Sequence, residues 1–458
     1  MHYMDKFFNK EYMIQFFENH LLDKKGGGRD HMSPEKFYSQ QLHSIPIIIN
    51  KCLTGKYHFA PYTEKLICKN KNKKPRVISI PTIRDRLVLG VLAKYLQNIF
   101  PECINHDLPN AYINKIKKYI EENEKNSIYF IRTDFESFYD SIKHNILIKK
   151  LKTRITDNNI IYLISNAIKT PTLPRQLSEK NAINSIGVPQ GLAISNILAQ
   201  IYTYNFDVFM KKGPCFFMRY VDDILLLCNK KSTLRKKKLI LKFIRYQYNL
   251  RLSKSKTFHG NLRNKDIDYL GYLLNSKIIT IRPKNVQTYL DRLAAKCTKF
   301  NDHFINKEKR SRLFMDDDNL FINTFFHEIN LMICGSKSES KLYGWLPFFI
   351  QMNDLSLLFQ LDKILNKFIN RIKCFENNRP KEIKTFIFAY YNLKYKNGGN
   401  AIFNYDKITT ITQKISYLIQ HGQINNEDEY SNEQIEKIFS KYKRKNLSNL
   451  EQDQGNIY

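Results

Sequence analysis

The stretch Tyr220-Val221-Asp222-Asp223 decides the fold, because it sets two adjacent carboxylates directly before the apolar run 224–227. Two acids about 4 Å apart repel each other by roughly 1 kcal/mol in water and by several times more in a protein. A half-buried hairpin tip tolerates such a pair best when a cation is bound, so the stretch indicates a metal site. The alternative is an ordinary hairpin turn that uses two aspartates.

A third acid ends another strand-like segment upstream. The apolar run 128–131 continues through Arg132 and Thr133 into Asp134, which places this carboxylate at the end of a buried strand. Three carboxylates on two neighbouring strands suit phosphoryl transfer, in which two Mg²⁺ ions about 3.5–4 Å apart clamp the attacking and leaving oxygens. The alternative is that Asp134 only begins the turn into a helix.

A glycine-bracketed turn lies between these acids, over residues 187–196, and opens into an apolar helix that runs toward Tyr204. Gly187 and Gly191 allow the backbone to approach a ligand closely, and Gln190 can both donate and accept hydrogen bonds. A helix N-terminus also favours a nearby phosphate. An ordinary loop before a helix is the alternative for this stretch taken alone.

In this order, Asp134, the turn 187–196 and the stretch 220–223 resemble motifs A, B and C of reverse transcriptases. Residues 74–81, followed by Arg84-Asp85-Arg86, resemble the fingers segment that grips the triphosphate in bacterial and group II intron-type enzymes. Residues 250–257 and 268–272 resemble motifs D and E. Gly28-Arg29-Asp30 resembles an element ahead of the fingers, although His31 stands where the family usually has a second glycine. The resemblance covers residues from about 26 to 280.

The resemblance implies roles for individual residues. Two Mg²⁺ ions, with Mn²⁺ as a substitute, would be held by Asp134 and Asp222, with Asp223 close by as a weaker or intermittent ligand. The backbone carbonyl of Phe135 would complete one shell. Lys256 would lie near the departing pyrophosphate. Tyr139 would lie under the sugar and exclude a 2′-hydroxyl, so deoxynucleotides are expected. The other implied positions bind the nucleotide (Lys74, Arg76, Gln190 and Gly191) or the primer end (Tyr269, Leu270, Gly271 and Tyr272).

The expected fold is α+β, a right-hand polymerase with an antiparallel palm sheet and helices. Residues 1–126 would form an N-terminal helix and the fingers, with strands near 63–69 and 75–80. Residues 127–280 would form the palm, with insertion elements of the fingers around 150–190. An all-helical thumb over 281–375 and a helical extension with a polar tail over 376–458 would follow.

The charge indicates a polyanionic partner. Lysine and arginine number 74 against 43 acids, which gives a net charge of +31. Self-repulsion of this size destabilises a fold unless phosphates or counterions neutralise it. An RNA template, a DNA product and deoxynucleoside triphosphates are the expected partners. A basic RNA-binding assembly protein with a vestigial site is the alternative outside the enzymes.

Eight scattered cysteines, without a Cys-x-x-Cys pair, argue against a zinc module and favour reduced thiols in the cytoplasm. The longest apolar runs are too short to span a bilayer, so no membrane partner is expected.

The biological role rests on resemblance alone. The region 320–373 resembles the helical extensions of standalone antiphage reverse transcriptases, of the abortive-infection type. Retron or group II intron-type enzymes are the alternatives, as is untemplated or protein-primed synthesis from a tyrosine such as Tyr442 or Tyr458. A cognate noncoding RNA, a second protein or a homo- or hetero-oligomer would fit any of these roles.

Overall fold

The computed structural model describes residues 5–22, 27–68, 75–105, 107–174, 183–213, 215–229, 233–376, 378–396, 398–425 and 429–453. Two compact units make up the chain. The N-terminal unit comprises residues 1–106 and 128–260, and the C-terminal unit comprises residues 107–127 and 261–458. The boundaries of the four domains expected from the sequence stay predictions. The compact units follow different limits, since residues 107–127 and 261–280 group with the C-terminal residues.

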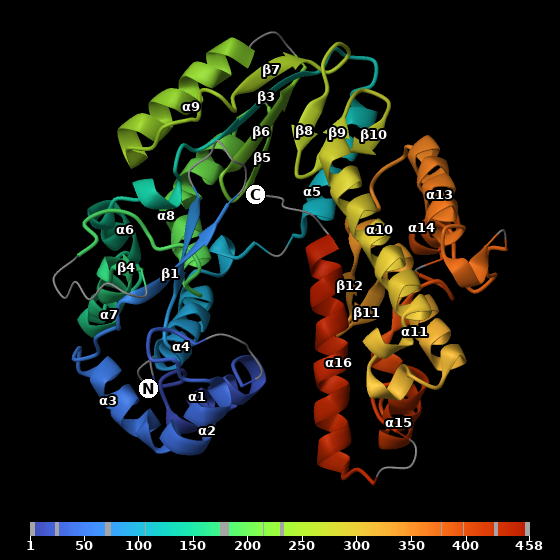
Figure 1. Ribbon diagram of the computed structural model, residues 1–458. Helices are drawn as coiled ribbons and strands as arrows, with labels where there is room; N and C mark the ends of the chain where they lie inside the picture. Colours follow the sequence, from blue (N-terminus) through green and yellow to red (C-terminus); the bar gives the residue numbers. More distant parts are fainter. Residues whose placement is uncertain are drawn as a thin grey trace. The chain divides into compact units, whose positions relative to one another are not determined.

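A four-stranded sheet forms the centre of the N-terminal unit, in the order β5-β6-β3-β7 (Figure 1). The strands are β3 (Tyr129–Asp134), β5 (Phe216–Tyr220), β6 (Asp223–Cys228) and β7 (Phe258–Asn261). Strand β6 is paired antiparallel with both β5 and β3. Its residues 224–228 are all buried, because both faces of this inner strand are covered. The antiparallel palm sheet expected from the apolar runs is present.

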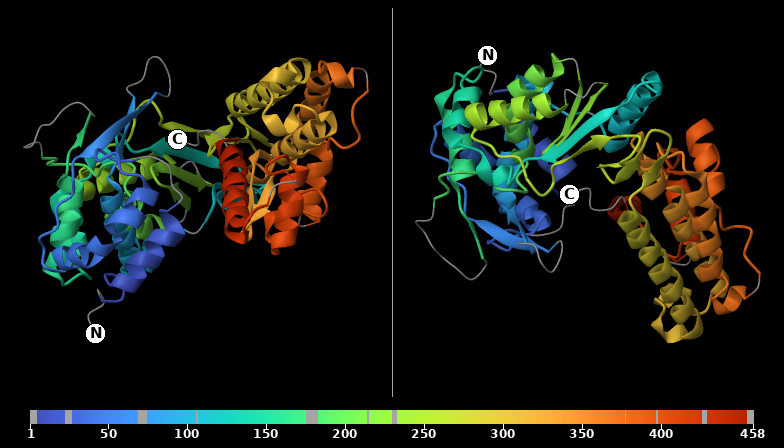
Figure 2. Two further views of the ribbon diagram at one scale, coloured as in Figure 1. Left: turned by 60° about the horizontal axis from the view of Figure 1, so that its bottom comes forward. Right: turned by 90° about the horizontal axis from the view of Figure 1, so that it is seen from above.

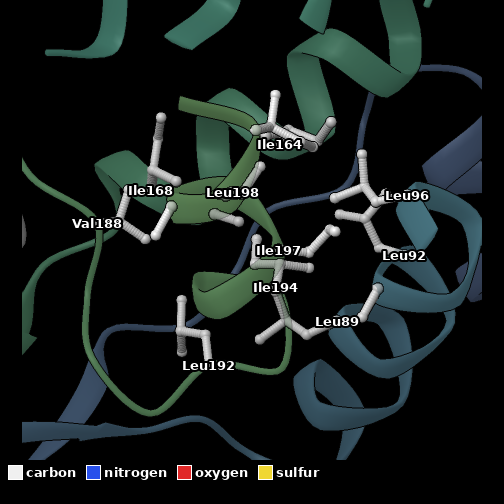
Figure 3. Close-up of a cluster of buried hydrophobic side chains, with 14 of the residues drawn as sticks. Leu89, Leu92, Leu96, Ile164, Ile168, Val188, Leu192, Ile194, Ile197 and Leu198 are labelled. Atoms are coloured by element: carbon white, nitrogen blue, oxygen red, sulfur yellow. The ribbon is translucent and has the colours of Figure 1, made fainter. Parts of the chain in front are cut away.

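Helices cover this sheet. α8 (Ser195–Lys211) contacts β5, and α9 (Thr233–Tyr248) contacts β3 and α8. The start of α8 and the turn before it pack against α4 (Ile83–Ile99) and α7 (Asn158–Lys169). Figure 3 shows Leu192, Ile194 and Ile197 between side chains of these two helices. The packing of Leu192 and Ile194 in this core therefore stabilises the glycine-bracketed turn.

The expected fingers hairpin is present. β1 (Tyr62–Ile67) and β2 (Arg76–Ile80) are antiparallel, and β1 also pairs with the short parallel strand β4 (Thr172–Leu173). Lys74 lies outside the described residues. The remaining helices of this unit are α1 (Lys10–His20), α2 (Pro34–Gln41), α3 (Ile45–Leu53) and α6 (His144–Leu151).

The C-terminal unit is mainly helical, and its yellow-to-red helices lie side by side in Figure 2. Its helices are α5 (Pro109–Glu122), α10 (Pro283–Ile305), α11 (Asp318–Cys334), α12 (Trp345–Phe348), α13 (Leu355–Ile369), α14 (Phe386–Tyr395), α15 (Ile411–Gln420) and α16 (Asn432–Asp453). A sheet of β8 (Ile267–Tyr269), β9 (Tyr272–Leu274) and β10 (Ile279–Ile281) precedes α10.

The expectation that residues from 281 onward are all-helical needs a correction. β11 (Ser336–Ser338), β12 (Lys341–Tyr343) and β13 (Phe403–Asn404) form a second small sheet. Its hairpin turns at Glu339 and Ser340, which both have positive φ, and Asp406 accepts hydrogen bonds from their backbone N–H groups. So short a hairpin has no apolar alternation that would distinguish it in the sequence.

The expectation of reduced thiols also needs a correction, because Cys215 and Cys228 form a disulfide. The antiparallel register of β5 and β6 places these residues opposite each other, with their Cα atoms 4.9 Å apart. Spacing along the chain could not reveal this pairing. None of the described helices combines the length and the apolar character that a bilayer crossing requires.

Candidate active site

The pairing of β3 with β6 brings the predicted acids together. Asp134 is the register partner of Asp223, and the N–H of Phe135 donates to the carbonyl oxygen of Asp222 at 3.2 Å. The ends of the two strands therefore lie side by side. Residues separated by most of the palm in the sequence thus meet at one edge of the sheet, as the strand-end argument predicted.

Asp134 has the surroundings of a cation ligand. Its residue is 6 % exposed, and its Oδ1 atom is buried without a hydrogen-bond partner among the described residues. Its Oδ2 atom contacts the ammonium of Lys256, whose side chain is half exposed. A buried carboxylate oxygen without a donor is unfavourable unless a ligand such as a metal ion occupies the site. The residues therefore fit a divalent cation, with Lys256 as the charge partner of Asp134 in this structure.

Asp223 is held differently from Asp222. The Nε and Nη2 atoms of Arg132 donate to its two carboxylate oxygens, each at 3.2 Å. Such a bidentate pair fixes the plane of the carboxylate. In the described part of the chain, no three His, Cys, Asp or Glu side chains converge tightly enough to hold a metal. The pairing with Arg132 is consistent with two principal acids, Asp134 and Asp222, rather than three equal ones.

The electrostatics of the site favour a bound cation. Burial raises the pKa of Asp222, and the charge of Asp134 raises it further, against the opposing charges of Lys256 and Arg76. Burial also raises the pKa of Asp223 to about 6, against the lowering effect of Arg132. Both carboxyls are therefore less stable in their charged forms than they are in water, and a cation would reverse this.

The tip of the β5–β6 hairpin has a strained backbone, which the side chain of Arg219 stabilises. Val221 has φ +55°, in the left-handed region that a β-branched residue rarely occupies. Arg219, whose side chain is 2 % exposed, donates to the Val221 carbonyl and to Asp207 of α8, with Nε 2.7 Å from Oδ1. Its Nη2 atom also donates to Gln200 of α8 at 2.6 Å. Arg219 therefore ties the strained tip to the helix beneath it.

The glycine-bracketed turn lies against the fingers and against the segment after Asp134. Gly191 has φ +103°, and a Cβ atom there would lie 2.8 Å from Ile78 of β2. The Gln190 carbonyl accepts from the N–H of Ser79 at 2.7 Å. Burial raises the pKa of Asp140, and a hydrogen bond from the Gln190 side chain opposes this shift. Gln190 and Gly191 are thus held next to the strand that carries Arg76.

Tyr139 and Arg76 lie within electrostatic reach of Asp222. Burial and the charge of Asp222, opposed by Arg76 and Arg219, raise the pKa of Tyr139 to about 12. Arg76 is half-buried at the start of β2. Tyr139 and Arg76, two of the five residues expected to contact the nucleotide, therefore lie in the same surroundings as the candidate catalytic acids.

Other predicted residues have structural partners. Arg84 contacts Asp85 and lies over the ring of Tyr57, while Arg86 donates to the carbonyl of Pro81 at 3.1 Å. Asp85 is fully buried and accepts from the Tyr57 hydroxyl at 2.7 Å, so it stabilises the start of α4.

The predicted primer-binding residues belong to the C-terminal unit. Leu270 and Gly271, both with positive φ, form the two-residue turn between β8 and β9, as hairpin turns of this length require. Tyr269 and Tyr272 are fully buried, and Tyr272 donates to the carbonyl of Phe348 at 2.7 Å. Their primer contact stays a prediction.

Sequence reasoning missed Arg132, Arg219 and Asp207 as supports of the site. The positions of Arg132 and Arg219, two and three residues before a predicted acid, were a usable signal. Asp207 gave none, because only the packing of α8 brings it to Arg219.

Comparison with known proteins supports the interpretation of these residues as a candidate active site. Residues 67–274 match the family described as "Reverse transcriptase (RNA-dependent DNA polymerase)". The "Uncharacterized 91 kDa protein in cob intron" of Schizosaccharomyces pombe is 28% identical over 225 residues, which is 46% of this chain and 27% of that protein. The "Group II intron-encoded protein LtrA" of Lactococcus lactis subsp. cremoris is 28% identical over 170 residues, 36% of this chain and 28% of that protein.

Among solved structures, telomerase from Candida albicans in complex with a TWJ fragment of telomeric RNA has a TM-score of 0.45 at 15% identity. The match covers 91% of this chain and 67% of that one. The chain spans only about a quarter of the length of the two curated relatives.

The paired strands, their carboxylates and the glycine-bracketed turn together form a candidate site for nucleotide addition. Residues 67–274, which carry these features, match the reverse transcriptase family, and an intron-encoded protein is among the relatives that the chain resembles. The expected fold class, α+β of the right-hand polymerase type, is confirmed.

Proposed function

We propose that this protein is an RNA-directed DNA polymerase that adds deoxynucleotides to a primer by a two-metal mechanism. The observation that carries the proposal is the meeting of Asp134 and Asp222 at paired strand ends, where Oδ1 of Asp134 is buried and receives no hydrogen bond from the residues that the structure describes. The match of residues 67–274 to the reverse transcriptase family supports it.

Asp134 and Asp222 would hold the Mg²⁺ ions, with Asp223 and the carbonyl of Phe135 close by. When bound, the ions would neutralise the charge that develops on the attacking and leaving oxygens. The chain's own residues orient the reactants: Arg76 would bind the triphosphate by paired N–H donors, and Gln190 and Gly191 would support the nascent base pair. Lys74, the second expected triphosphate contact, lies outside the described residues.

Lys256 contacts Asp134 in this structure, and its half-exposed ammonium can leave that carboxylate when a cation binds. In that case it would be free to meet the departing pyrophosphate, which is the role expected of it.

Primer extension on an RNA template tests the proposal. We expect Asp222→Asn to lower the rate by on the order of 10³-fold, equal to about 4 kcal/mol, because the change removes a charge that only positioning and neutralisation can replace. Asp266→Asn, at an exposed acid outside the site, is the matched control and should extend normally. Full extension by Asp222→Asn would disprove the site assignment.

For the biological role we propose antiphage defence, with an RNA template, a DNA product and a cognate noncoding RNA or second protein as partners. The resemblance of the region 320–373 to the helical extensions of antiphage reverse transcriptases supports this choice. Cells that carry the gene with its flanking DNA should resist phage, and the same cells with Asp222→Ala should not. Equal sensitivity of both strains across a phage panel would argue for a retron or intron-type role instead.

Protein-primed synthesis is less well supported. Tyr442 is 3 % exposed, so its hydroxyl is not presented to a nucleotide, and Tyr458 lies outside the described residues.

A further inference from the structure

A cavity of about 310 Å³ lies within the C-terminal unit, and none of the residues that line it belongs to the candidate active site. Three helices each contribute one face to it. Residues three, four and seven apart share one side of a helix, and the lining follows this spacing. The polar residues of the lining are Arg292, Lys296 and Lys299 from α10, Glu328 from α11, and Asn446, Asn449 and Asp453 from α16. Its volume lies at the lower end of the range of about 300–1,000 Å³ for ligand sites.

Asp453 is the unusual member of this lining. Its side chain is 1 % exposed, and neither carboxylate oxygen accepts a hydrogen bond from the described residues. The Nη1 atom of Arg292 lies 2.6 Å from Oδ1 and supplies charge without an aligned hydrogen bond. Burial raises the pKa of Asp453 to about 7, against the opposing effect of Arg292. Two acceptor oxygens thus line a cavity without the donors that burial ordinarily requires.

The cations of α10 form a row beside this carboxylate. Lys296 pairs with Glu328, and Arg292 donates from Nη2 to the carbonyl of Asn449 at 3.1 Å. Lys299 is exposed and forms no ion pair with the described residues. Its ammonium is therefore available for an anion. The cavity lining therefore offers two buried hydrogen-bond acceptors, the carboxylate oxygens of Asp453, and one exposed cation, the ammonium of Lys299.

We propose that this cavity binds a guanine nucleotide, with Asp453 accepting from the base and Lys299 contacting the phosphate. The base edge of guanine presents two adjacent donors, N1–H and N2–H, which match the two oxygens of one carboxylate. Oδ1 of Asp453 can accept one of these donors beside its ion pair with Arg292. Adenine presents one donor beside an acceptor, and that acceptor would face a carboxylate oxygen. Ala295, Leu331, Met332 and Leu450 supply the apolar walls that a base requires.

The nucleotide can be free or part of an RNA strand, since both present the same base edge and phosphate. The proposal does not depend on polymerase activity, because its residues are separate from the acids at β3 and β6.

Calorimetry on the full chain tests the proposal, with GMP and AMP as probes and EDTA present so that no metal-dependent site contributes. We expect GMP to bind at least tenfold more tightly than AMP, equal to about 1.4 kcal/mol. Asp453→Asn should weaken GMP at least tenfold without weakening AMP, because an amide replaces one acceptor by a donor. Lys299→Ala should weaken both nucleotides, and Asp222→Asn should change neither.

Equal affinity for GMP and AMP, or GMP binding that both cavity variants leave unchanged, would overturn the proposal. If Asp453→Asn fails to fold, the GMP/AMP ratio and the Lys299→Ala variant decide alone, since Lys299 is exposed. A five-nucleotide RNA with one central guanosine distinguishes the sources. Tighter binding of this RNA than of GMP indicates a strand, and tighter binding of GMP indicates a free nucleotide. Loss of primer extension by Asp222→Asn with GMP binding intact would separate the two functions.

Discussion

Two neighbouring acids at the hairpin tip, Asp222 and Asp223, have different surroundings. Asp223 is fixed by the two hydrogen bonds from Arg132, while Asp222 lies under the influence of Asp134, Lys256 and Arg76. The sequence could predict that this pair and Asp134 form a site, because strand ends are recognisable. The resemblance also implied that Asp223 is the weaker ligand. The hydrogen bonds from Arg132 are consistent with that expectation, but they could not be foreseen, because they depend on an arginine that reaches Asp223 from the adjacent strand.

Tyr139 provides the sharpest prediction for a single residue. We expect Tyr139→Ala to lower the preference for deoxynucleotides over ribonucleotides at least ~10-fold in kcat/KM, because the ring would no longer exclude a 2′-hydroxyl. Incorporation of each nucleotide kind by purified protein measures this ratio. Tyr139→Phe keeps the ring and should keep the preference. An alanine variant that still rejects ribonucleotides would show that Tyr139 only packs beside Phe138.

At the scale of elements, the β5–β6 hairpin depends on α8. Arg219 links the carbonyl of Val221 to Asp207, so the helix opposes relaxation of the strained tip that carries Asp222. Both residues of this ion pair lie mostly within the protein, with side-chain exposures of 2 % and 18 %. If Asp222 is catalytic as proposed, Arg219 is a positioning residue for it, and stability and activity should respond separately to its loss.

We expect Arg219→Met to destabilise the protein by about 3 kcal/mol, because it leaves the Asp207 carboxylate partly buried and unpaired. Adding Asp207→Leu should restore most of this stability, since both charges are then gone. The kcat for nucleotide addition should stay low in both variants, with KM changed less. Urea unfolding and single-nucleotide extension measure the two effects. Recovery of kcat together with stability in the double variant would show that Arg219 serves folding alone.

The packing of α11 against the residues after α15 predicts a pH dependence of stability. The ring of His327 stacks on that of His421 at 4.0 Å and bonds the Tyr417 hydroxyl at 2.9 Å. Burial, together with the charges of His421 and Lys384, lowers the pKa of His327 to about 3. Burial also lowers the pKa of His421, against the charge of Glu328. Both rings are therefore held neutral in the folded protein.

Below the ordinary histidine pKa of about 6.5, His327 binds a proton in the unfolded chain but stays neutral in the folded protein. The free energy of unfolding therefore decreases as the pH falls. The contribution of His327 should decline by up to about 1.4 kcal/mol per pH unit between about pH 6.5 and its folded pKa of about 3. Urea unfolding of the wild type and of His327→Gln, at a series of pH values, measures it. The variant should show a flatter dependence, while His43→Gln, at an exposed position, should match the wild type. Identical slopes for the wild type and His327→Gln would rule out this coupling.

For the whole molecule, the charge is the dominant physical property. A net charge of +31 should make binding of a primer–template duplex depend steeply on salt, because each neutralised phosphate releases counterions. A protein that makes about 6–10 phosphate contacts loses about 10³–10⁵ in affinity between roughly 50 and 200 mM salt. Fluorescence anisotropy with a labelled duplex measures the slope. A nearly flat dependence would mean that the excess charge lies away from the nucleic acid.

The sequence by itself determined the acids, the glycine-bracketed turn, the fingers hairpin and most of the long helices. These features depend on local periodicity and on the residue types at strand ends, and both can be recognised directly in the sequence. Tertiary structure alone decided the disulfide between Cys215 and Cys228, the β11–β12 hairpin sheet, the support of Asp223 by Arg132 and of Val221 by Arg219, and the cavity around Asp453. Each of these features depends on contacts between residues that are distant in the sequence, which form only when strands pair and helices pack. Such contacts cannot be predicted from the spacing of residues along the chain.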